Sequence, residues 1–238
     1  MVQAACEEVV RIEAASYIYR VQHRTMEGDC QYDHGPRLVE IPALEVDKYP
    51  VTNLRFQRFL TESGYKPADD TNFLKHWRHG AYPDGQENHP VVWVSQSDAK
   101  AFATWVGGRL PYDYEWQWIA CGTQKTKWPW GNQFDARKCN GEEGGCMMPV
   151  TAFPEGAGEF GCLDLCGNAW EWVEDVVDDG MHYFTFLRGG SYYKAPHMWH
   201  AEGGPQPTDF HLKFPLLNEG LNRNETVGFR CVKEVGGA

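Results

Sequence analysis

The sequence of 238 residues has no apolar run approaching the roughly 18 residues that a membrane-spanning helix needs. Its N-terminus, MVQAACEEVVRIEAAS, carries two glutamates where a signal peptide has basic and then unbroken apolar residues. The sequence therefore predicts a cytoplasmic protein without a membrane partner. A secreted or periplasmic location is compatible with the sequence only if a leader has been removed.

Basic residues are scarce, with 22 lysines and arginines against 33 acidic residues and a formal net charge of −11. No Lys/Arg cluster is evident that could follow a phosphate backbone, so a nucleic-acid partner is not expected. The phosphate-binding motif GxxxxGK is missing as well, which argues against common nucleotide-dependent enzymes. The eight cysteines include no CxxC pair, so neither a structural zinc site nor a disulfide-built scaffold is expected.

Aromatic residues and glycine are abundant instead, with 10 Trp, 11 Tyr, 12 Phe and 25 Gly. After residue 122, Gly, Pro and Asn interrupt the chain every few residues, which predicts a loop-rich C-terminal half with a few short strands. Irregular backbone leaves carbonyl groups that no strand ladder pairs. Bound calcium is one efficient way to organise such carbonyls together with carboxylates.

Three helices are predicted within one α+β domain covering residues 1–238. The first follows Thr52 as its cap and ends at Gly64. The second begins with a capping box formed by Ser95 and Asp98. Its buried stripe is expected to be Ala99, Phe102, Ala103 and Val106, with Gly107 and Gly108 ending the helix. The short segment YEWQWIACG predicts the third helix, and residues 1–45 read as strands in a meander.

Seven sequence blocks occur in a fixed order along the chain. They are VDKYPVTNLRFQRFL, HPVVWVSQSDAKAFATWVGGRLPYDYEWQWIACG, WPWGNQFD, PVTAFP, GCLDLCGNAWEWVED, LRGGSYY and TVGFRCV. This series resembles the sulfatase-modifying-factor superfamily, which includes the formylglycine-generating enzyme and domains of ergothioneine and pyoverdine biosynthesis enzymes. The resemblance covers about residues 37–233. It implies a C-type-lectin-like α+β fold with short strands and two to three helices, often stabilised by calcium.

The resemblance implies a calcium site in the block DLCGNAWEW. Its ligands would be the side chains of Asp164 and Glu171 and the carbonyls of Gly167 and Ala169. Asp164 stands where the family usually has asparagine. Independently of the family, hard oxygen donors this close in sequence suit Ca²⁺, which takes roughly six to eight oxygens. The same carboxylates could instead cap a turn without metal. A second family site would begin at Asn140, with Glu142 or Glu143 as its acidic ligand.

The copper centre of the formylglycine-generating enzyme is altered in this sequence. In that enzyme, two cysteines five residues apart in the loop after GGSY bind copper and oxidise a substrate cysteine to formylglycine. The resemblance places Lys194 and Trp199 at these positions, and neither an ammonium nor an indole supplies the sulfur donor that Cu(I) needs. Copper and formylglycine-generating activity are therefore not expected. Cys121 and Cys231 match disulfide cysteines of the enzyme whose partners are missing here, and they are expected to be small buried hydrophobes.

A non-catalytic binding module is the favoured function. The altered loop is rich in aromatic and polar side chains suited to stacking on a sugar ring or an organic cation. The candidate ligand-binding residues are Trp170, Ser191, Tyr192, Tyr193, Lys194, His197, Trp199, His200 and Glu202. A glycan or another small polar or cationic molecule is the expected partner. Tyr193 and Trp199 could equally pack this loop onto the core.

Two alternative functions stay open at this point. A metal-dependent oxidoreductase of the pyoverdine or ergothioneine type would need iron or another metal. Its ligands would come from His182, His197, His200 and His211 with Glu202 or Asp209, and His76 and His79 form a weaker candidate pair. A protein-interaction domain would use an acidic run to dock a basic partner, although such runs are usually solvated. That run consists of Glu174, Asp175, Asp178 and Asp179.

Overall fold

The computed structural model describes residues 7–24, 31–141, 145–178, 180–193 and 203–236. The helices in these ranges are α1 (Asn53–Ser63), α2 (Gln96–Trp105), α3 (Asp113–Cys121) and α4 (Glu219–Asn222), with the 3-10 turns η1 (Ala136–Lys138) and η2 (Pro154–Gly156). The strands are β1 (Val9–Ile12), β2 (Ala15–Arg24), β3 (Gln31–Ile41), β4 (Leu44–Asp47), β5 (Trp170–Trp172), β6 (Val177–Asp178), β7 (Tyr183–Arg188), β8 (Gly190–Ser191), β9 (Gly204–Pro205), β10 (Phe210–Pro215), β11 (Val227–Gly228) and β12 (Val232–Glu234). No helix in these ranges has the length and apolar character needed to span a bilayer.

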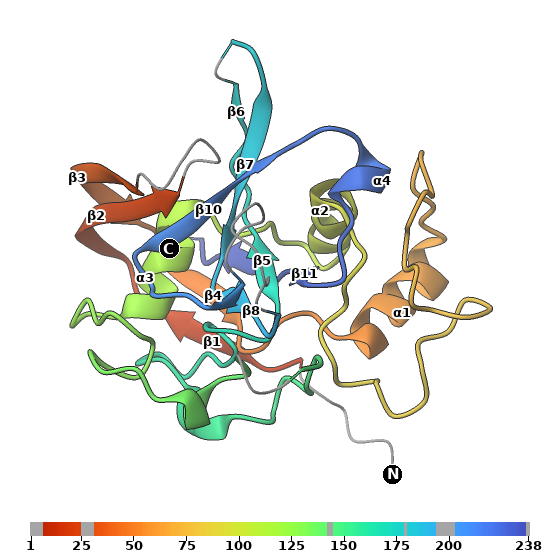
Figure 1. Ribbon diagram of the computed structural model, residues 1–238, viewed down its shortest axis with the longest axis horizontal. Coiled ribbons are helices and arrows are strands. Elements are labelled where there is room, and N and C mark those ends of the chain that lie inside the picture. The colour runs from red at the N-terminus through yellow and green to blue at the C-terminus, as the bar shows by residue number, and fades with distance from the viewer. Residues whose placement is uncertain (1–6, 25–30, 142–144, 179, 194–202, 237–238) are drawn as a thin grey trace.

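A seven-stranded sheet forms the centre of the molecule, with the order β11-β5-β7-β10-β2-β3 and with β6 paired to β7 (Figure 1). Most neighbours are antiparallel, whereas β10 runs parallel to β2 and β11 runs parallel to β5. The predicted N-terminal meander is in fact divided between two sheets, because β2 pairs with β3 while β1 pairs with β4. Figure 1 shows α1 and α2 at the right of the view, the β2–β3 edge of the sheet at the left, and the β6–β7 hairpin extending away from the body.

The predicted helix ends are confirmed with one correction. The Thr52 side chain accepts from the backbone N–H of Arg55, and Gly64 ends α1 in the left-handed conformation with φ +67°. Both hydrogen bonds of the Ser95–Asp98 capping box are present in α2. Val106 was wrongly placed in the buried stripe. Because α2 ends at Trp105, Val106 is its C-cap, and it is 38% exposed.

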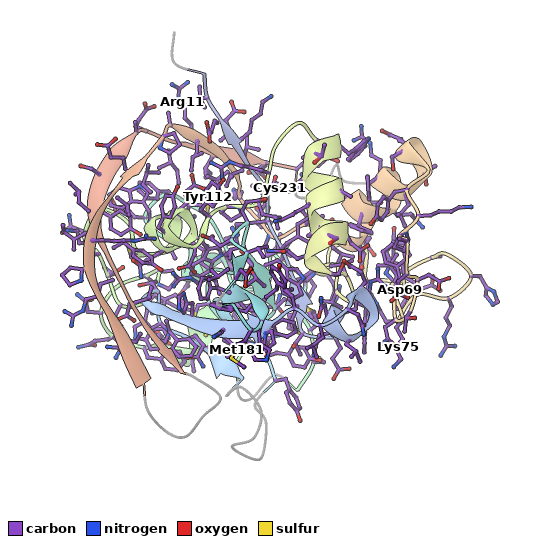
Figure 2. The ribbon with its side chains drawn as sticks, turned by 90° about the horizontal axis from the view of Figure 1, so that it is seen from above. Arg11, Asp69, Lys75, Tyr112, Met181 and Cys231 are labelled. Atoms are coloured by element: carbon purple, nitrogen blue, oxygen red, sulfur yellow. The ribbon has the colours of Figure 1, made fainter. Side chains whose placement is uncertain are left out.

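Two large hydrophobic clusters make up the core. The first joins α1 and α2 to β5, β7, β10 and β11, and Phe102 of α2 lies at its centre. Its ring stacks on Phe56 of α1 at 5.7 Å and meets Phe229 edge-on at 5.4 Å. The second cluster packs α3 against β1, β2, β4 and β12. Cys121 and Cys231 are buried free thiols, as predicted, and Figure 2 shows Cys231 in the interior of the molecule.

Three glycines at 156, 158 and 161 have the spacing GxGxxG of a dinucleotide-binding turn. They lie at the end of η2 and in the loop that follows it, and no α-helix begins there. The phosphate in such a turn binds at a helix N-terminus. This spacing therefore carries no nucleotide site.

Candidate functional site

The segment in which calcium was predicted is a buried turn that leads into β5. Asp164, Gly167 and Asn168 all have positive φ. Gly167 is required here, because a Cβ at this position would lie 2.1 Å from the carbonyl oxygen of Asn140. The Asn168 amide then fixes the turn, donating to Asp164 Oδ2 at 2.8 Å and to Met148 O at 3.0 Å. This local geometry brings Asn140 next to Gly167, so the two predicted metal regions are neighbours.

Three of the four predicted ligands in this turn have oxygens suited to calcium. Burial, with a smaller contribution from Glu171, raises the pKa of Asp164 to about 7, so a bound cation would favour the charged form of this carboxylate. The carbonyls of Gly167 and Ala169 accept no hydrogen bond from any residue that the structure describes. A buried carboxylate and two open carbonyls are hard oxygen donors of the kind that calcium prefers. These three residues therefore fit the ion.

Glu171, the fourth predicted ligand, is already engaged by other groups. Its Oε1 accepts from Arg230 Nη2 at 2.6 Å, and its Oε2 accepts from Arg230 Nε and Trp116 Nε1, both at 2.7 Å. The Glu171 and Arg230 side chains are both fully buried. Most of the acceptor capacity of this carboxylate, and its charge, is thus already satisfied. Sequence reasoning gave Arg230 no role, and its only signal was its place in the GFRC block.

The second predicted calcium region is less complete. Asn140 is buried, and its side-chain amide donates to Cys146 O at 2.8 Å and to Asn168 Oδ1 at 2.9 Å. Glu142 and Glu143, the alternative acidic ligands, lie outside the described residues. Within the described part of the chain, no three His, Cys, Asp or Glu side chains come together as a metal-binding group.

The candidate ligand-binding residues fall into three environments. Ser191 lies buried in β8, which pairs with β9. Next to it, Tyr192 is half-buried and Tyr193 is 48% exposed. Trp170 is a core side chain, only 4% exposed, with its ring 6.5 Å from that of Phe210. The remaining five candidates, Lys194, His197, Trp199, His200 and Glu202, lie outside the described residues.

His211, a candidate for a redox metal, belongs to a buried ion network. Its Nδ1 lies 3.0 Å from Asp113 Oδ2, and its ring stacks on Phe186 at 3.9 Å. Arg188 Nε donates to Asp113 Oδ1 at 2.6 Å, and the Tyr19 hydroxyl also donates to this carboxylate. Burial alone would raise the pKa of Asp113, but Arg188 and His211 hold it below its usual range. The network joins α3 to three strands, and sequence reasoning missed it.

The other sequence candidates are also placed by their contacts. His76 lies in a turn and accepts from Trp77 Nε1 at 3.1 Å, and burial lowers its pKa to about 4. His79 is in the left-handed region, so the two histidines do not share a helix face. In the acidic run, Glu174 pairs with Lys100 at 3.0 Å. Asp175 accepts from the Asp113 N–H at 2.6 Å, Asp178 is exposed, and Asp179 lies outside the described residues.

Comparison with known proteins defines the class. The structure of PvdO from Pseudomonas aeruginosa shares this fold with a TM-score of 0.68 and 22% identity, covering 97% of this chain and 95% of that one. The α+β fold of the formylglycine-generating-enzyme type, predicted from the sequence, is thereby confirmed. Residues 2–235 match the sulfatase-modifying factor enzyme 1-like domain, and the chain belongs to this family.

The relatives include proteins named as formylglycine-generating enzymes and others named as inactive. The inactive C-alpha-formylglycine-generating enzyme 2 of Bos taurus is 27% identical over 91% of this chain and 86% of its own length. The formylglycine-generating enzyme of the same species is 31% identical over 58% of this chain. The chain spans only about half the length of some curated relatives that it matches. This protein is therefore a formylglycine-generating-enzyme-like domain.

Proposed function

We propose that this chain is a non-catalytic member of the family that binds a ligand through the loop after Ser191. The observation that carries the proposal is the presence of Lys194 and Trp199 at the positions that the family resemblance assigns to the copper-binding cysteines. A Cu(I) centre needs soft sulfur donors, which these side chains do not supply. The similarity to proteins named as inactive formylglycine-generating enzymes supports a member without that activity.

The ligand is a carbohydrate or another small polar or cationic molecule. Tyr193, with about half of its surface exposed, offers a ring face where the chain leaves β8. The Ser191 hydroxyl donates to the Tyr193 carbonyl at 3.2 Å, which helps to fix the backbone at Tyr193. Aromatic faces bind sugar rings and organic cations by stacking, and Trp199 adds an indole on the same loop.

Calcium stabilises the fold in this proposal and has no part in a reaction. Asp164 holds the ion together with the carbonyls of Gly167 and Ala169, and the ion offsets the charge of the buried carboxylate. A ligand bound only by the folded state stabilises it by mass action, about 2.7 kcal/mol at a hundredfold excess over Kd. For a domain of this size, excess chelator should lower Tm by about 5–10 °C. An unchanged Tm, or the same decrease in Asp164→Ala, would contradict this part of the proposal.

Ligand binding is tested with a glycan array read together with tryptophan fluorescence, extended to quaternary ammonium probes. The wild type is expected to respond to at least one probe, and Trp199→Ala to lose that response. Trp130→Ala is the matched control and is expected to respond like the wild type. Trp130 lies in a loop, and its indole N–H donates to Gln133 O. No response to any probe, or equal responses from both variants, would refute the proposed ligand class.

A further inference from the structure

A cavity of about 550 Å³ has a lining that includes neither Ser191 nor Tyr193. It lies between β2, the C-terminal end of α3, the loop 125–132 and the segment 206–212. Small-molecule sites typically have volumes of about 300–1,000 Å³. The cavity is therefore large enough for a small ligand, and neither the family resemblance nor the proposed function uses it.

The walls of this cavity are tied together by hydrogen bonds. Thr208 connects two of them, because its hydroxyl donates to Thr126 O at 2.7 Å and its N–H donates to Lys127 O at 2.9 Å. A third wall is attached where the Gln22 N–H donates to Asp209 O at 2.7 Å. A cavity that is already assembled avoids the cost of ordering loops when a ligand binds.

The inner side of the cavity carries a fixed amide. Gln117 of α3 donates from Nε2 to Arg20 O at 2.9 Å and to Thr208 O at 3.2 Å, and its Oε1 accepts from the Tyr17 hydroxyl at 3.2 Å. Tyr17 and the neighbouring Phe210 add aromatic surface to the lining. The cavity thus combines oriented polar groups with apolar area, as small-ligand sites do.

The charge of the lining is opposite to that of the whole protein. Arg20, Lys125 and Lys127 line the cavity with a single carboxylate, Asp209, although the chain has a net charge of −11. In the part of the chain that the structure describes, the ammonium groups of Lys125 and Lys127 make no hydrogen bond and no ion pair. Two unpaired cations at the mouth of a concave site attract and hold an anionic group.

Asp209 adds a requirement for a hydrogen-bond donor. Its Oδ1 is buried and accepts no hydrogen bond from the residues that the structure describes. A buried acceptor without a partner is unfavourable, so a ligand hydroxyl that reaches it would supply the missing donor. A hydroxyl group is a suitable donor, because it adds no charge beside the two lysines.

We infer that this cavity binds a small hydroxylated anion, namely a sugar phosphate or a sugar acid. The phosphate or carboxylate interacts with Lys125 and Lys127, a hydroxyl donates to Asp209, and the carbon skeleton lies against Tyr17 and Phe210. The inference does not rest on the proposed function, so either can fail without the other.

Calorimetric titration with glucose 6-phosphate, gluconate, inorganic phosphate and glucose tests the inference. Glucose 6-phosphate or gluconate is expected to bind, and which of the two binds more tightly distinguishes a phosphate from a carboxylate ligand. Neutral glucose is expected to bind at least about tenfold more weakly, since it lacks the charge-assisted contacts. The absence of binding by both charged sugars, or equal binding of glucose, would overturn the inference.

Variants locate the site. The double variant Lys125→Glu/Lys127→Glu should weaken binding of the charged sugar at least about tenfold. Lys66→Glu is the matched control, because Lys66 is also exposed and unpaired among the described residues but lies outside the cavity lining. Asp209→Leu should weaken binding of the charged sugar but not of inorganic phosphate. Equal affinities in the double variant and in Lys66→Glu, with matching melting temperatures, would refute the assignment.

Discussion

Replacing Arg230 with methionine removes the buried cation beside the candidate calcium site. Arg230 and Glu171 are both fully buried and share two hydrogen bonds, at 2.6 and 2.7 Å. Arg230 also donates to Leu163 O at 2.7 Å. Breaking a buried pair from one side leaves an uncompensated charge and typically costs about 3–5 kcal/mol. We expect Arg230→Met to lose at least that much free energy of unfolding when calcium is absent.

Calcium should return part of this stability. Arg230 favours the charged form of Asp164 and Glu171 disfavours it, so removal of Arg230 leaves two carboxylates that repel each other and that calcium could bind. Each tenfold gain in calcium affinity adds about 1.4 kcal/mol at saturating calcium. Urea denaturation in excess chelator and in excess calcium measures the difference, which should be larger for Arg230→Met than for the wild type.

Arg223→Met is the matched control for this experiment. Arg223 is another fully buried arginine, paired with Asp98 at 2.8 Å, and it also donates to two backbone carbonyls. Its loss should destabilise the protein to a similar extent, with no greater response to calcium than the wild type shows. Equal calcium responses from the two variants would refute the assignment of the calcium site beside Glu171. Arg230→Lys, which keeps the charge, should fall between the wild type and Arg230→Met.

Three further changes test the electrostatics and the turns. Asp175 has a pKa raised to about 6 by burial and by Asp113, so its protonated form is favoured in the folded state and stability is lost as pH rises from about 4 to 6. Between pH 4 and pH 7, the free energy of unfolding of Asp175→Asn should therefore fall by up to about 3 kcal/mol less than that of the wild type, as measured by urea denaturation. Parallel plots of this free energy against pH for the two proteins would contradict the prediction. Ser95→Ala removes one bond of the capping box and should lower Tm by about 2–4 °C in thermal melts, whereas an unchanged Tm would show that the cap adds no stability. Gly167→Ala should lower the free energy of unfolding by about 1–3 kcal/mol more than Gly85→Ala. The two glycines have similar φ, +77° and +79°, but only at Gly167 would an added Cβ meet a backbone atom. Equal losses of unfolding free energy in the two variants would contradict this.

Local features of the fold could be predicted because a few neighbouring residues determine them. Thr52 and Gly64 set the ends of α1 through hydrogen bonds within one turn, and Ser95 and Asp98 do the same for the start of α2. The four-residue helix α4 was missed, since it is too short to show a periodic pattern. The parallel pairing of β10 with β2 was also missed, because strand order depends on contacts between distant segments.

The candidate site was predicted in part, and only through the family blocks. They located Asp164 and Gly167 in one turn, but they did not show that Glu171 is bound by Arg230, 59 residues away in sequence. Asp113 and His211 are 98 residues apart, and no local pattern links them. Trp170 was among the predicted ligand-binding residues, and the structure shows its side chain only 4% exposed. Pairing of buried charges is decided by tertiary packing, which the sequence shows only indirectly.

The central claim is that Lys194 and Trp199 leave the chain without a copper centre. Competitive Cu(I) titration of the purified chain, with mass spectrometry of a sulfatase-derived cysteine peptide incubated in the same sample, tests it directly. The account predicts no stoichiometric Cu(I) and no aldehyde for the wild type, and a gain of Cu(I) binding for the double variant Lys194→Cys/Trp199→Cys. One tightly held Cu(I) per wild-type chain, or conversion of the peptide cysteine to formylglycine, would contradict it.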